Sequence, residues 1–139
     1  MSERQTVLVS ASLLSANPAG LGEDAARVSR AGADLLHLDV MDGHFVPPIT
    51  YGPSVAASLK GTGASLDVHL MVDCLDYAVP AFAPYSDRLT VHVEATPLLH
   101  RILGDIRNRG CKAGVALNPA TPPEFLPNVF PLIDTVLVM

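Results

Sequence analysis

The chain has 139 residues, of which 49% are hydrophobic and 17% are charged. This composition excludes a disordered protein, because disordered chains bury too little apolar surface to offset the entropy of ordering. Nine Lys and Arg against fourteen Asp and Glu give a net charge of −5, so no basic surface is available for a nucleic acid or an anionic membrane. We therefore expect one globular domain over residues 1–139, with neither nucleic-acid nor membrane partners.

The amino terminus and the cysteines indicate the compartment. Residues 1–6 lack the charged and then apolar layout of a signal peptide, and every apolar run is far shorter than the roughly 20 residues that span a bilayer. The two cysteines, Cys74 and Cys111, show no CxxC spacing. These features predict a cytoplasmic protein with two free thiols.

Apolar runs rich in β-branched residues alternate along the chain with segments of helical periodicity. The expected strands cover residues 6–14, 33–41, 65–72, 89–94, 112–117 and 135–139. The expected helices follow Asn17-Pro18, cover 53–60, lie within 75–82, and run from Thr96-Pro97 towards Gly110. Thr121 and Glu124 have the spacing of a capping box, although Pro127 and Pro131 leave little room for a helix after it.

Six apolar strands separated by helical segments predict an α/β fold, in which helices cover a parallel sheet. A complete (βα)8 TIM barrel usually takes about 250 residues, more than this chain contains. An open doubly wound sheet would fit the length, but neither a GxGxxG nor a GxxxxGK[ST] loop follows the first strand. The polar residues of the strands, described next, favour an incomplete barrel of the TIM-barrel class, and we predict one with six parallel strands.

Polar side chains recur on one face of the second and third strands. The two-residue period of a strand places His37 with Asp39, and Asp67 with His69, each pair on a single face. A buried carboxylate needs a partner, and two imidazoles with one carboxylate suit Zn²⁺, Fe²⁺ or Mn²⁺. Spacing alone leaves open the alternative of hydrogen-bonded Asp–His pairs that fill the barrel without a metal.

Longer segments extend this pattern. They are 10–18 (SASLLSANP), 37–47 (HLDVMDGHFVP), 66–72 (LDVHLMV), 90–95 (TVHVEA) and 110–122 (GCKAGVALNPATP). In this order, and over essentially the whole chain, they resemble the ribulose-phosphate 3-epimerases. The resemblance implies the amino-terminal portion of a ribulose-phosphate-binding (βα)8 barrel that interconverts D-ribulose 5-phosphate and D-xylulose 5-phosphate, with a divalent cation at its carboxyl-terminal mouth.

The resemblance also implies roles for the residues of this face. His37, Asp39 and His69 match the metal ligands of the family, and Asp39 also matches the acid/base on one face of the substrate C3. His69 and Ser12 match contacts to the substrate.

Two methionines complete the implied site. Met41 and Met71 match the thioethers that flank the reacting carbons, where a polarisable, uncharged wall suits a planar enediolate.

Other parts of the family's site lie further along the chain. In the family, the acid on the opposite face of C3 is an aspartate of the seventh strand, and loops after strands seven and eight hold the phosphate. This sequence stops at Met139 in the sixth strand, so we expect those groups to be absent from it. The open alternatives are a hexulose-phosphate epimerase with the same metal triad and a noncatalytic fragment that binds metal or associates with itself. We expect a sugar-phosphate substrate and a homo-oligomer.

The remaining histidines have simpler interpretations. His92 and Glu94 share one face of the fourth expected strand and are interpreted as a structural hydrogen-bonded pair. His44 and His100 are expected to face solvent.

Overall fold

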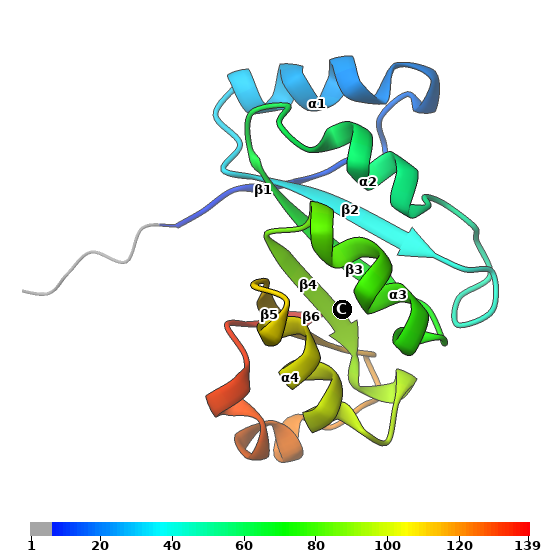
Figure 1. Ribbon diagram of the computed structural model, residues 1–139, viewed down its shortest axis with the longest axis vertical. Helices are drawn as coiled ribbons and strands as arrows, with labels where there is room; N and C mark the ends of the chain where they lie inside the picture. Colours follow the sequence, from blue (N-terminus) through cyan, green and yellow to red (C-terminus); the bar gives the residue numbers. More distant parts are fainter. Residues whose placement is uncertain (1–6) are drawn as a thin grey trace, which may run out of the picture.

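The computed structural model describes residues 7–139, which form one parallel sheet with helices along its outer side (Figure 1). The strands are β1 (Ser10–Ser12), β2 (Leu35–Met41), β3 (Ser65–Met71), β4 (Arg88–His92), β5 (Lys112–Leu117) and β6 (Thr135–Val138). Each strand pairs with the next in chain order. A doubly wound sheet reverses its strand order, whereas this sheet winds in one direction and curls. The prediction of an incomplete barrel is therefore confirmed.

Four α-helices connect the strands. They are α1 (Leu21–Arg30), α2 (Pro53–Leu59), α3 (Leu75–Phe82) and α4 (Leu99–Asn108). In α4 the helical spacing of Ile102, Leu103 and Ile106 forms an apolar stripe, and all three side chains are buried in the core. Gly110 follows with a φ of 85°, a left-handed conformation that ends a helix at little cost to glycine.

The two faces of the sheet differ in chemistry because side chains alternate along each strand. Leu36, Leu38 and Val40 of β2 belong to the hydrophobic core beneath the helices. The residues between them, His37 and Asp39, lie on the opposite, concave face. The helices therefore fix the sheet from one side and leave polar groups on the other.

Aspartates before alternate strands hold neighbouring strands in register. The carboxylate of each aspartate accepts a hydrogen bond from a backbone N–H of the neighbouring strand or its flank. Asp34, before β2, accepts from Val9 (2.8 Å). Asp87, before β4, accepts from Leu66 (2.7 Å), and Asp134, before β6, accepts from Ala113 (2.9 Å). The backbone N–H of each aspartate donates to the carbonyl of the same residue. This two-point contact repeats three times and sets the register of β1–β2, β3–β4 and β5–β6.

Several expected strands are shorter than their sequence pattern, among them the first and the fourth. The first, expected over 6–14, is a strand only over Ser10–Ser12, and residues 1–6, with the signal-peptide prediction, lie outside the described residues. The fourth ends at His92, after which Val93–Ala95 form a 3₁₀ turn.

The predicted capping box is wrong. No α-helix follows Thr121, and the chain forms 3₁₀ turns over Pro123–Asn128 and Phe130–Leu132. Proline lacks the N–H that an α-helix needs, so Pro127 and Pro131 prevent a longer helix. The Thr121 hydroxyl donates instead to Glu94.

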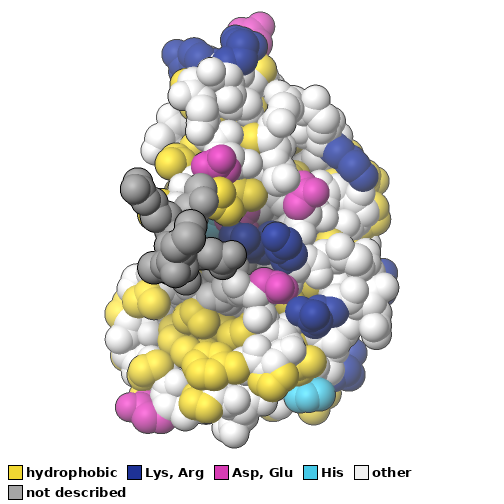
Figure 2. Space-filling model, turned by 90° about the vertical axis from the view of Figure 1, so that its left-hand side faces the viewer, with side chains coloured by type: hydrophobic (Ala, Val, Ile, Leu, Met, Phe, Trp, Pro, Cys, Tyr) yellow, Lys and Arg dark blue, Asp and Glu magenta, His cyan; other side chains and the backbone are white. Residues whose placement is uncertain are grey.

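Figure 2 looks at the end of the molecule where the strands begin, and it shows acidic and basic side chains beside a patch of hydrophobic ones. The outermost strands are β1 and β6, and hydrophobic side chains at or beside them are exposed, among them Val7 (87%) and Val138 (78%). Among residues 7–139, none of the helices is both long and apolar enough to cross a membrane.

Candidate active site

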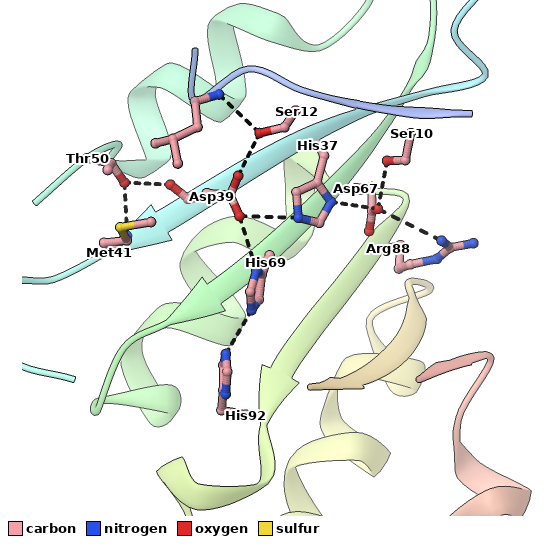
Figure 3. A network of polar contacts seen from close by, with 11 residues as sticks. Ser10, Ser12, His37, Asp39, Met41, Thr50, Asp67, His69, Arg88 and His92 are labelled. Carbon is pink, nitrogen blue, oxygen red and sulfur yellow. Dashed lines mark hydrogen bonds and ion pairs between the residues drawn. The ribbon is translucent and has the colours of Figure 1, made fainter. Parts of the chain in front are cut away.

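The register of the first three strands assembles a polar cluster on the concave face (Figure 3). β2 and β3 pair His37 with Asp67, and Asp39 with His69. β1 places Ser12 opposite His37. Residues paired in this way across a parallel sheet point to the same side, so their side chains meet.

Asp39 lies at the centre of this cluster. Its Oδ1 is 3.3 Å from His37 Nε2 and 3.1 Å from His69 Nδ1. The Ser12 hydroxyl donates to Oδ2 at 2.9 Å. One potential ligand atom from each of His37, Asp39 and His69 lies within 4.8 Å of the others. The structure thus brings together the three residues for which metal binding is predicted, with Ser12 beside them.

A second carboxylate fixes the hydrogen of His37. Asp67 Oδ2 is 2.9 Å from His37 Nδ1, accepts the Ser10 hydroxyl at 3.1 Å and lies 3.9 Å from the Arg88 guanidinium. Burial would raise the pKa of Asp67, but the hydrogen bond to His37 and the charges of His37 and Arg88 hold it below its usual value. An ionised carboxylate only accepts, so His37 Nδ1 carries a hydrogen. In a neutral His37 ring, Nε2 therefore presents its lone pair to Asp39.

The donor set fits a divalent cation. A carboxylate oxygen of Asp39 and one ring nitrogen each of His37 and His69 lie within 4.8 Å of one another. Groups that accept hydrogen bonds repel one another unless a cation or a proton lies between them. Imidazole and carboxylate suit Zn²⁺, Fe²⁺ and Mn²⁺, and the carboxylate of Asp67 behind His37 is a common outer-shell partner in such sites.

Without a metal, a proton on His37 serves as the cation. Burial would lower the pKa of His37, but hydrogen bonds to Asp39 and Asp67 and their negative charges outweigh it and raise this pKa to about 9. Burial would likewise raise the pKa of Asp39, but the hydrogen bond and charge of His37 and the hydrogen bond from Ser12 hold it well below its usual range. In the metal-free chain at neutral pH, an imidazolium therefore lies between two carboxylates.

This ion cluster makes metal-free stability depend on pH. Because the pKa of His37 rises from 6.5 to about 9 on folding, its contribution is complete below pH 6.5 and is lost as the pH rises through about 9. We expect the urea midpoint in EDTA to fall between pH ~6 and pH ~9.5. The His37→Gln variant should show a clearly smaller fall, and equal falls in the two proteins would contradict the assignment.

His92 is a member of the cluster that the sequence pattern did not place there. Its Nε2 is 2.9 Å from His69 Nε2, and its ring is almost fully buried beside Phe45. The expected hydrogen bond to Glu94 is present, from Nδ1 to Oε2 at 3.2 Å, although Glu94 belongs to a 3₁₀ turn. Thr90 is the register partner of His69, so the period of two in β4 could have placed His92 on the same face.

The other predicted residues lie where their strand pattern places them. Met41 and Met71 are register partners at the ends of β2 and β3, on the strand face that carries Asp39 and His69. Their contact with substrate stays a prediction. His44 and His100 are exposed, as expected.

Comparison with known proteins adds a family to this geometry. Residues 8–139 match the family model described as the ribulose-phosphate 3 epimerase family. The ribulose-phosphate 3-epimerase of Bacillus subtilis is 48% identical over 135 residues, which are 96% of this chain and 62% of the relative. That of Escherichia coli K12 is 47% identical over 95% of this chain and 60% of the relative. The chain thus spans less than two thirds of the length of these curated relatives.

Solved structures with low sequence identity share the fold. The phospho-2-dehydro-3-deoxyheptonate aldolase of Thermotoga maritima superposes with a TM-score of 0.70 at 13% identity, over 97% of this chain and 41% of that protein. A structure from Burkholderia cenocepacia gives a TM-score of 0.67 at 18% identity, over 95% of this chain and 55% of that one. At these identities the likeness concerns the fold alone.

Proposed function

The chain belongs to the ribulose-phosphate 3-epimerase family, and on this premise we propose that it provides the amino-terminal part of an active site that inverts C3 of D-ribulose 5-phosphate to give D-xylulose 5-phosphate. The observation that carries the proposal is the position of Asp39. Its carboxylate is central to the cluster, and its contacts keep it ionised at neutral pH. An ionised, oriented carboxylate is what removal of a proton from carbon requires.

The surrounding side chains prepare Asp39 for this step. His37 and His69 contact Oδ1, and Ser12 donates to Oδ2, so the carboxylate plane is held from both sides. A divalent cation held by His37, Asp39 and His69 would stabilise, as a Lewis acid, the negative charge that develops on the C2 oxygen.

Further residues would contact the sugar. We assign substrate contacts to Ser12 and His69, and an uncharged wall along the planar intermediate to Met41 and Met71. Inversion also needs proton transfer on the opposite face of C3, which in the family belongs to the aspartate of the seventh strand.

Exchange of the C3 proton with solvent tests the proposal. If Asp39 removes the C3 proton and then returns a deuteron taken from solvent to the same face, C3 is exchanged without inversion. We therefore expect NMR in D₂O to show metal-dependent loss of the C3–H signal of ribulose 5-phosphate. A hexulose 6-phosphate serves as the comparison substrate, and faster exchange of the hexulose would favour the related hexulose-phosphate epimerase. Exchange no faster than in buffer with the cation alone would contradict the proposed function.

A further inference from the structure

A line of hydrogen bonds runs away from the predicted metal ligands towards β4. From His69 Nε2 it passes to His92 Nε2 at 2.9 Å, and from His92 Nδ1 to Glu94 Oε2 at 3.2 Å. Figure 3 shows the two rings facing each other through their ring nitrogens. Their centroids are 5.0 Å apart and their planes are inclined by 21°. Both rings are almost fully buried, at 1% exposure each, so water has little access to replace either partner.

Glu94, at the β4 end of this line of hydrogen bonds, decides which ring nitrogen donates in each of them. Glu94 accepts the backbone N–H of Asn118 at 2.8 Å and the hydroxyl of Thr121, both on Oε1, which leaves Oε2 for His92. Because a carboxylate only accepts, His92 Nδ1 carries the hydrogen. Nε2 of the neutral His92 ring is then an acceptor, so the hydrogen between the two rings belongs to His69 Nε2.

The position of this hydrogen decides whether His69 can bind a cation through Nδ1. His69 Nδ1 lies 3.1 Å from Asp39 Oδ1, and that carboxylate by itself would favour a hydrogen on Nδ1. A hydrogen there would occupy the lone pair through which His69 can bind a cation. Asp39 and His92 therefore compete for the single hydrogen of a neutral His69. Only the hydrogen bond from Nε2 to His92 leaves Nδ1 without a hydrogen.

We propose that His92 and Glu94 are positioning residues that hold the hydrogen of His69 on Nε2, so that Nδ1 remains available to a divalent cation. The inference rests on the proposed function for the cation, but the position of the hydrogen is a property of the metal-free chain. His37 receives the equivalent support from Asp67 directly, whereas His69 receives it through a second imidazole. Outer partners of this kind are typically worth 10–100-fold in metal affinity.

The test is ¹⁵N NMR of the imidazoles in the metal-free chain, combined with Zn²⁺ affinity measured by chelator competition. We expect His69 as the Nε2–H tautomer and His92 as the Nδ1–H tautomer. His92→Phe keeps an aromatic ring beside Phe45 but removes the acceptor, so the hydrogen of His69 should move to Nδ1 and Zn²⁺ affinity should fall about 10–100-fold. His92→Gln, whose amide oxygen can accept, should retain most of both properties, and His100→Phe on the surface should change neither.

An Nδ1–H tautomer of His69 in the metal-free wild-type chain would overturn the inference, as would a His92→Phe variant that matches His100→Phe in both measurements. If the Phe variant does not fold, the wild-type tautomer decides the question. A wild-type chain with the expected tautomers but no affinity for Zn²⁺, Mn²⁺ or Fe²⁺ would contradict the proposed function and leave the hydrogen-bond assignment intact.

Discussion

Asp39→Asn is expected to slow exchange of the C3 proton of ribulose 5-phosphate with solvent by about 10²–10⁴-fold, the usual contribution of a general base. An amide cannot accept this proton at neutral pH, and it is a poorer metal ligand than a carboxylate. The measurement belongs in a full-length protein, made by joining residues 1–139 to the remaining carboxyl-terminal part of the Bacillus subtilis relative. In that fusion the parent exchange rate is expected to be high enough for a large loss to be seen.

Asp76→Asn is the matched control, because Asp76 lies on the surface of α3, where it pairs with Arg101. It should exchange the proton at the parent rate. Circular dichroism should show that both variants keep the fold, since an asparagine amide retains the shape of the carboxylate that it replaces. An Asp39→Asn protein with the parent exchange rate would remove Asp39 from its proposed role.

A polypeptide of residues 1–139 alone is expected to have little or no epimerase activity. Asp39 serves one face of C3, whereas the family's second acid lies on a seventh strand that this polypeptide does not contain, and each such group is worth about 10²–10⁴-fold. The phosphate-holding loops are also outside it, so binding energy that would position the sugar is lost. We expect the fusion described above to restore turnover, measured as formation of xylulose 5-phosphate.

The open edges of the sheet also lead us to expect self-association of the 139-residue polypeptide. β1 and β6 are the two edges of the sheet, and the exposed valines in or beside them, including Val7 and Val138, favour pairing with another chain. Size-exclusion chromatography of the 139-residue polypeptide should therefore show self-association. A soluble monomer with the turnover of the fusion would contradict this prediction and would point to Glu94 as the replacement acid, to be tested by Glu94→Gln.

The strand pattern was sufficient to place the central residues of the site on one face. Alternation along β2 and β3 put His37 with Asp39 and Asp67 with His69, because a buried strand tolerates polar side chains only where they meet partners. It did not give the register, which decides that Asp39 lies opposite His69 and not opposite Asp67. The register depends on backbone pairing between β2 and β3, whose residues are far apart in sequence.

The misses have the same physical origin. The hydrogen bond of His92 with Glu94 was predicted correctly, but the contact of His92 with His69 was not, because His69 lies on another strand. The capping-box pattern at Thr121 failed because tertiary contact with Glu94 used the hydroxyl that a helix would have needed.

The central claim is that His37, Asp39 and His69 hold one divalent cation, and anomalous X-ray diffraction from crystals grown with Zn²⁺ tests it most directly. We predict a single strong peak on the concave face, about 2.0–2.2 Å from His37 Nε2, from a carboxylate oxygen of Asp39 and from His69 Nδ1. Crystals that bind zinc only elsewhere, or that bind it through His69 Nε2, would contradict the account.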